Sequence, residues 1–92
     1  MLQVATTVDG RPSVSGELDL LEVPALEAFL AGAAEIDLSG VTFFDSSALR
    51  VFLACRRRNK DLRVVNPSAA VVKVLQITCT LEYLVHGREI DW

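Results

Sequence analysis

The chain has 92 residues, of which 51% are apolar and 23% are charged, and its formal net charge is −3. This length suits one domain with a small core, which we expect to span residues 1–92. The acidic balance argues against a general nucleic-acid surface. No apolar run approaches the ~18 residues that cross a bilayer, and no segment has the pattern of a targeting signal. We therefore expect a cytoplasmic protein without direct membrane insertion.

The first third of the chain predicts a hairpin followed by a helix. Residues 4–8 and 13–18 are strand candidates, and the Asp-Gly pair between them tolerates the positive φ of a tight hairpin turn. Residues 20–32 predict a helix, because apolar side chains recur there at three- and four-residue steps. The two strands are expected to pair with each other in antiparallel fashion.

Strands and helices alternate in the rest of the chain. The predicted elements are a strand at 34–38, a helix from 46 or 47 to about 58, a strand at 62–65, a helix at 68–77 and a candidate fifth strand at 83–85. Such alternation implies parallel crossovers, with helices that cover the sheet. We expect an α/β fold with a mixed four- to five-stranded sheet, an N-terminal hairpin and about three to four helices packed against it.

The segment Asp45-Ser46-Ser47 lies where an apolar strand leads into the second predicted helix. The first backbone N–H groups of a helix are unpaired and its dipole is positive there, so a phosphate is well accommodated. Simple N-capping explains the same residue types, since Asp and Ser are favoured caps. Two hypotheses therefore stand for this segment, a structural cap and a reversible charge switch on a serine.

The residue types that usually carry catalysis or bind metals form no recognisable pattern. Cys55 and Cys79 lie far apart and lack metal-ligand spacing, so we interpret them as reduced thiols buried like small hydrophobes. A redox pair is the alternative, and it requires Cα atoms within about 7 Å. His86 has no nucleophile in its sequence context. We expect no catalytic residues, no metal and no cofactor.

A mostly basic run at residues 56–60, Arg-Arg-Arg-Asn-Lys, closes the second predicted helix. Cations at a helix C-terminus offset the negative end of the dipole, which accounts for such a run without any partner. A small basic docking patch is the alternative interpretation. The run is too short, and the chain too acidic, to predict binding of DNA or RNA.

Three segments resemble the motifs of the STAS domain family, the fold of bacterial anti-sigma factor antagonists. Residues 36–49 read Ile-Asp-Leu-Ser-Gly-Val-Thr-Phe-Phe-Asp-Ser-Ser-Ala-Leu, which is similar to the family signature. Gly16-Glu17-Leu18-Asp19 is similar to its other recurring motif, and residues 62–68 are similar to the segment that enters the third helix. The matches occur in the expected order and cover nearly the whole chain, so together they predict the STAS fold.

The resemblance implies a function as an anti-sigma factor antagonist. In that family the unphosphorylated protein binds an anti-sigma factor that is a serine kinase, and this frees the sigma factor. The kinase phosphorylates the serine after the aspartate, here Ser46, and a serine phosphatase reverses the step. The expected partner-binding residues are Asp19, Asp45, Ser46, Ser47, Ala48 and Arg50.

Other roles remain open for a STAS domain of this size. Some small members are cytosolic subunits that dock on the ATPase of a lipid-trafficking ABC transporter, and a module of a larger signalling assembly is a third role. We expect a monomer or a weak homodimer, since an exposed hairpin edge can pair with another copy.

The chain departs from the family pattern at three places. Ala48 stands where the family usually has glycine, and we expect binding to be tolerated but retuned. Cys79 replaces a turn glycine, which predicts a less tight turn after the third helix. The usual final helix is expected to be short or absent, with Trp92 covering core surface or contacting another chain.

Overall fold

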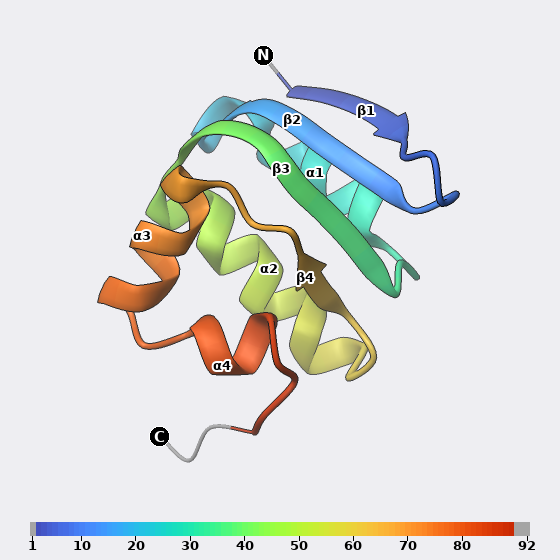
Figure 1. Ribbon diagram of the computed structural model, residues 1–92. Helices are drawn as coiled ribbons and strands as arrows, with labels where there is room; N and C mark the ends of the chain where they lie inside the picture. The colour runs from blue at the N-terminus through green and yellow to red at the C-terminus, as the bar shows by residue number, and fades with distance from the viewer. Residues whose placement is uncertain (1, 90–92) are drawn as a thin grey trace.

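Four strands form one sheet in the order β1-β2-β3-β4 in the computed structural model, which describes residues 2–89 (Figure 1). The elements are β1 (Leu2–Thr6), β2 (Pro12–Leu18), the 3-10 helix η1 (Leu20–Glu22), α1 (Val23–Leu30), β3 (Glu35–Phe44), α2 (Ser46–Arg58), β4 (Arg63–Val65), α3 (Ala69–Ile77) and α4 (Leu81–Leu84). β1 pairs antiparallel with β2, and the β2–β3 and β3–β4 pairs are parallel. The expected α/β fold, with an N-terminal hairpin and a sheet that mixes parallel and antiparallel pairs, is confirmed.

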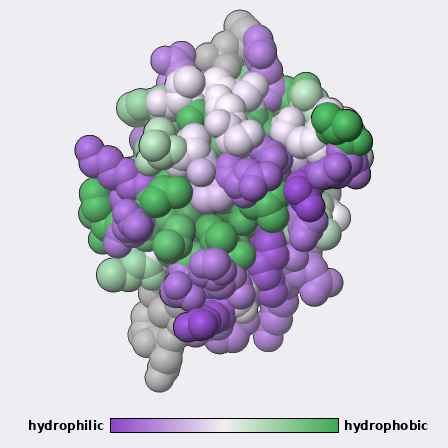
Figure 2. All heavy atoms as spheres, viewed as in Figure 1, coloured by the Kyte–Doolittle hydropathy of each residue, from purple (hydrophilic) through white to green (hydrophobic). Residues whose placement is uncertain are grey.

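The helices pack against one face of the sheet (Figure 1). Inward-facing side chains such as Val14 of β2 and Ile36 of β3 are fully buried, and they meet Leu26 of α1, Phe52 of α2 and Leu75 of α3 in a single apolar core. Figure 2 shows residues of intermediate hydropathy over the upper part of the molecule, where the sheet lies. Burial of the sheet is therefore one-sided, although it does not alternate strictly along β3, where Ile36, Asp37 and Leu38 are all buried.

The first strand ends two residues earlier than the sequence predicted. Strand pairing stops at Thr6 and Pro12. Beyond it, the Thr7 N–H donates to the Arg11 carbonyl (2.7 Å) and the Gly10 N–H to the Thr7 carbonyl (2.9 Å). These bonds close the loop of the hairpin, so residues 7 and 8 belong to the turn.

The predicted helix at 20–32 is divided into η1 and α1. An α-helix beginning at Leu20 would require residue 24 to donate a backbone N–H to the Leu20 carbonyl, and Pro24 has none. The Val23 N–H donates to Leu20 instead, in the tighter 3-10 pattern. Pro24 then lies in the first turn of α1, where its missing N–H costs nothing.

β3 is much longer than the five residues predicted and continues to Phe44. Its second half pairs with the end of β2, with Glu17 opposite Phe43 and Leu18 opposite Phe44. The approach is close at Gly40, where an added Cβ would lie 2.7 Å from the Ser15 Cβ. The missing side chain at residue 40 therefore lets the strand continue through a segment predicted to be a loop.

The prediction of a fifth strand at 83–85 is wrong, because Tyr83 and Leu84 form the second half of the short helix α4 and Val85 is its C-cap. Tyr83 and Leu84 are buried against the other helices, and α4 contacts both α2 and α3. The expectation of a short final helix agrees with this element, while Trp92 lies outside the described residues. In α3, Val71 and Leu75 are buried and Val72 is half-buried.

The turn after α3 is tight, contrary to expectation, although it lacks glycine. Cys79 adopts the left-handed conformation, with φ of 61°. The Thr80 N–H donates to the Leu75 carbonyl (2.9 Å), which closes the end of the helix. Cys79 thus takes the conformation that favours glycine, at some conformational cost.

A buried carboxylate joins β3 to the loop after β4. Asp37 accepts hydrogen bonds from the Ser39 N–H (2.9 Å), the Ser39 hydroxyl (2.6 Å) and Asn66 Nδ2 (3.0 Å). Burial acts to raise the pKa of Asp37, but these hydrogen bonds, with the Arg11 charge, outweigh it and hold the pKa below its ordinary value. The carboxylate therefore helps to fix the loop that leads into α3.

Candidate functional site at the start of helix α2

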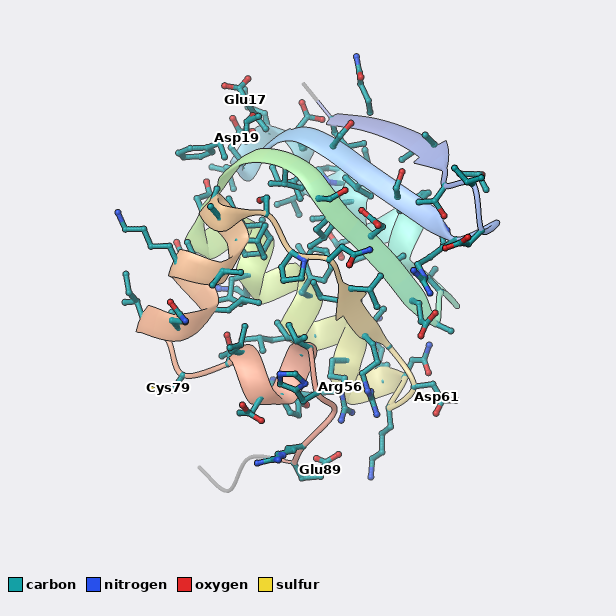
Figure 3. The ribbon with its side chains drawn as sticks, in the orientation of Figure 1. Glu17, Asp19, Arg56, Asp61, Cys79 and Glu89 are labelled. Carbon is teal, nitrogen blue, oxygen red and sulfur yellow. The ribbon has the colours of Figure 1, made fainter. Side chains whose placement is uncertain are left out.

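The site lies at one edge of the sheet, where two parallel neighbours end together. Leu18 is opposite Phe44, so the residues that follow them, Asp19 and Asp45, leave the sheet side by side. The Asp45 N–H donates to the Leu18 carbonyl (3.4 Å), which extends the pairing by one step. Figure 3 places Asp19 and Glu17 at the upper left, at the end of the molecule opposite Glu89.

Asp45 is the N-cap of α2. Its extended backbone, with φ of −111°, turns the chain into the helix, and its Oδ1 accepts a hydrogen bond from the Ala48 N–H (3.0 Å). Ser46 is the first helical residue, and its side chain is exposed. The Ser46 hydroxyl makes no hydrogen bond to any residue in the range 2–89. The capping role therefore falls to the aspartate, which leaves this hydroxyl accessible.

Asp19 has the same role one strand away. Its Oδ1 accepts a hydrogen bond from the Leu21 N–H (3.1 Å) at the start of η1. Because both carboxylates are engaged by backbone donors, they are held in fixed positions at the same edge of the sheet as Ser46. The Gly-Glu-Leu-Asp segment thus positions the start of η1 beside the start of α2.

Large apolar side chains are exposed around these caps. Leu20 is 68% exposed, Leu21 is 85% exposed and Phe43 is 48% exposed. We call the surface formed by Asp19, Leu20, Leu21, Phe43, Ser46 and Arg50 the rim. Neighbouring exposed apolar side chains with polar residues around them are typical of a surface that binds another protein.

A shallow groove of about 250 Å³ opens from the rim between η1–α1 and α2. It is lined by Leu20, Val23, Glu27, Ser47, Arg50, Val51 and Ala54. Most of this lining is apolar, whereas Glu27 and Arg50 place one charge of each sign on the α1 and α2 walls. Ser47 and Arg50, both predicted to face a partner, therefore lie on one wall of the same groove.

Ala48 does not belong to this accessible surface. Its side chain is 0% exposed and packs in the core with Leu49 and Phe52, which form the predicted buried stripe of α2. The Ala48 side chain, which was expected among the partner-binding residues, is therefore not exposed to a partner. Any effect of alanine in place of the usual glycine acts through packing of the helix start.

The basic run at the end of α2 is not a uniform solvated face. Arg56 is 1% exposed, and its guanidinium lies 4.6 Å from the centre of the Tyr83 ring. Its Nη2 donates to the Gly87 carbonyl (3.3 Å) and to Glu89 Oε1 (3.1 Å). This arginine therefore anchors the segment after α4, which excludes it from the docking patch that the sequence suggested.

The two cysteines have different surroundings. Cys55 is buried, and burial raises the pKa of its thiol. Cys79 is exposed, so the expectation that both are buried is wrong for this residue. Both are free thiols. Within residues 2–89, no three His, Cys, Asp or Glu side chains are grouped to hold a metal, and no helix is long and apolar enough to cross a membrane.

The fold and the site define a small α/β domain that presents the start of a helix, with an accessible serine, at one edge of a mixed sheet. A family model described as "Mlab, STAS domain" matches residues 3–80, and the chain therefore belongs to the STAS domain family. This match confirms the family that the sequence motifs resembled. No curated protein matches the chain closely enough to count as a relative.

Proposed function

We propose that the protein is an anti-sigma factor antagonist whose binding is switched off by phosphorylation of Ser46. The unphosphorylated form binds a serine-kinase anti-sigma factor through the rim and so releases the sigma factor. The observation that carries this proposal is the exposed Ser46 hydroxyl, which is free because Asp45 provides the cap. A serine needed only for capping would instead direct its oxygen to a backbone N–H.

The proposed modification is a phosphoryl transfer from ATP held by the kinase. The Ser46 oxygen forms a bond to the γ-phosphorus while the bond to the bridging oxygen breaks, ADP leaves and the hydroxyl proton passes to a base of the kinase. A phosphatase reverses the modification by transferring the phosphoryl group to water. In this scheme the STAS domain supplies an accessible oxygen and does not act as an enzyme.

The switch works through charge. A phosphate adds about −1.5 to −2 charges, which the positive end of the α2 dipole tolerates, so the fold is retained. A partner surface that fits a neutral hydroxyl would have to bury this charge, at a cost of several kcal/mol. A penalty of ~4 kcal/mol lowers affinity about a thousandfold. Phosphorylation would thus release the partner without unfolding the domain.

The test uses purified candidate kinases and ATP, followed by mass spectrometry of the peptide that contains Ser46. Affinity for the same kinases is then measured for Ser46→Glu and for its neutral isostere Ser46→Gln. We expect phosphate on Ser46 and a much larger loss of binding for Glu than for Gln. Equal binding by both variants, together with an unmodified Ser46, would contradict the proposal.

A second candidate function is favoured by the apolar character of the rim. Leu20, Leu21 and Phe43 expose large apolar side chains on the rim, and permanent interfaces are the more hydrophobic ones. The domain would then be a subunit that docks on the ATPase of a lipid-trafficking ABC transporter. Stable co-purification with such an ATPase, without phosphate on Ser46, would favour this function.

A further inference from the structure

Arg50 lies one helical turn after Ser46 and has no assigned interaction. It is exposed, it lines the groove beside Ser47, and it forms no hydrogen bond or ion pair with any other residue in the described part of the chain. Other charged groups at this edge include Glu17 on β2, Asp19 and Glu22 around η1, Glu27 on α1 and Asp45 before α2. Arg50 is therefore a free cation in a mainly acidic neighbourhood.

The geometry of a helix brings Arg50 toward Ser46. Residues four apart lie on the same face with Cβ atoms about 5–6 Å apart. Side chains on a helix lean toward its N-terminus, so the longer side chain of Arg50 extends back over the preceding turn. A guanidinium presents paired N–H donors that match the oxygens of a phosphate.

We propose that Arg50 is the internal counter-ion of a phosphate on Ser46 and draws this phosphate over the mouth of the groove. The inference rests on the proposed phosphorylation of Ser46. In this pairing Arg50 stays at the groove wall and holds the phosphate beside Ser47, which lines the same wall. Phosphorylation then closes the groove physically as well as adding charge to the rim.

The experiment uses the full chain with phosphoserine incorporated at position 46 during translation. Titration followed by phosphorus-31 NMR gives the second pKa of the phosphate in the parent, Arg50→Ala and Arg50→Lys proteins. We expect Arg50→Ala to raise this pKa by about 0.2–0.4 unit, because a helical ion pair of ordinary strength is lost. Arg50→Lys should give an intermediate value, since it keeps the charge but not the paired donors.

The matched control is Arg57→Ala. Arg57 is also exposed and lies on nearly the same side of α2 as Ser46, but it is roughly 16 Å from Ser46 along the helix axis. The Arg57→Ala substitution should leave the second pKa of the phosphate unchanged. An identical pKa in the parent, Arg50→Ala and Arg57→Ala proteins would overturn the proposal. If Arg50→Ala does not fold, Arg50→Gln, which keeps much of the aliphatic stem, provides the same comparison.

A second readout follows the arginine itself. The Nε–Hε signal of Arg50 should shift when Ser46 carries phosphate, and an unmoved signal would contradict pairing. Both measurements are made without a partner, so they separate this inference from the proposed function. A partner that stays bound after phosphorylation would contradict the antagonist mechanism, whereas an unchanged phosphate pKa would contradict only the role of Arg50.

Discussion

Asp19 and Asp45 stand at equivalent points of neighbouring parallel strands, and each accepts a hydrogen bond from a backbone N–H at the start of the next helix. The parallel pairing of β2 with β3 makes this coincidence possible, because it brings two strand ends to the same edge. The two carboxylates cap the helix starts at this edge, and Ser46 on the rim keeps an accessible hydroxyl.

Replacing Asp45 with alanine should lower the free energy of unfolding by about 1 kcal/mol, because the Ala48 N–H loses its acceptor. Urea denaturation measures this loss. Ser46→Ala is the matched control and should change stability by less than about 0.5 kcal/mol, since the exposed hydroxyl bonds to no described residue. Equal losses for the two variants would mean that the serine shares the capping role.

Arg56→Ala should lower the free energy of unfolding by about 2–3 kcal/mol. The buried side chain packs against the Tyr83 ring and ties down the segment after α4, so its removal costs packing as well as hydrogen bonds. Glu89→Gln should cost about 1 kcal/mol or less, because Glu89 is 67% exposed and its ion pair is screened by water.

The control for this series is Arg57→Ala, which removes an exposed arginine from the same helix. Thermal or urea unfolding of the three variants should rank Arg56→Ala as the least stable and Arg57→Ala as nearly unchanged. If Arg57→Ala destabilised the protein as much as Arg56→Ala, helix-dipole compensation would be the better account of the basic run.

Asp37→Asn should destabilise the protein by roughly 1–2 kcal/mol near neutral pH, because hydrogen bonds to a charged acceptor are lost. The folded pKa of Asp37 lies below its unfolded value of about 3.9. Its contribution to stability is therefore complete above that pH and fades as the pH falls through the folded pKa. Unfolding curves between about pH 6 and 2 should show the gap between parent and variant shrinking with acid. The exposed Asp61→Asn provides the control, and a gap that stayed constant would refute the prediction.

Cys79→Gly should raise the free energy of unfolding by about 0.5–1 kcal/mol, because glycine adopts the positive φ of this turn without a Cβ penalty. Cys79→Ala is the control, since it removes the sulfur and keeps the Cβ, and its stability should stay close to that of the parent. Thermal melting compares the three proteins. A glycine variant less stable than the alanine variant would show that the turn is not strained.

The elements with strong local patterns were predicted from the sequence. The helix from Ser46 to Arg58 has a cap, a buried stripe and a basic end, and each of these signals is local. The β2 strand and the hairpin likewise follow from turn chemistry and alternation. The family motifs added the order of these elements along the chain and the position of the serine among them.

The errors came from features that depend on distant partners. The segment after Leu38 contains Ser39 and Gly40, which usually indicate a loop, and only its pairing with β2 makes it a strand. A short apolar run such as 83–85 fits a strand or a buried helix equally well. The burial of Arg56 depends on Tyr83 and Glu89, which follow far later in the chain. Helical spacing places Arg56 on the buried stripe, four residues after Phe52, but the basic run gives no sign of these partners.

The placement of Glu89 at the end of the molecule away from Asp19 has a practical consequence (Figure 3). A tether or fused domain joined after this residue would extend away from the serine and the groove. The protein immobilised through that end on a sensor surface would keep its rim facing the solution. The binding of candidate kinases and ATPases could then be compared on the same immobilised protein, held in one orientation.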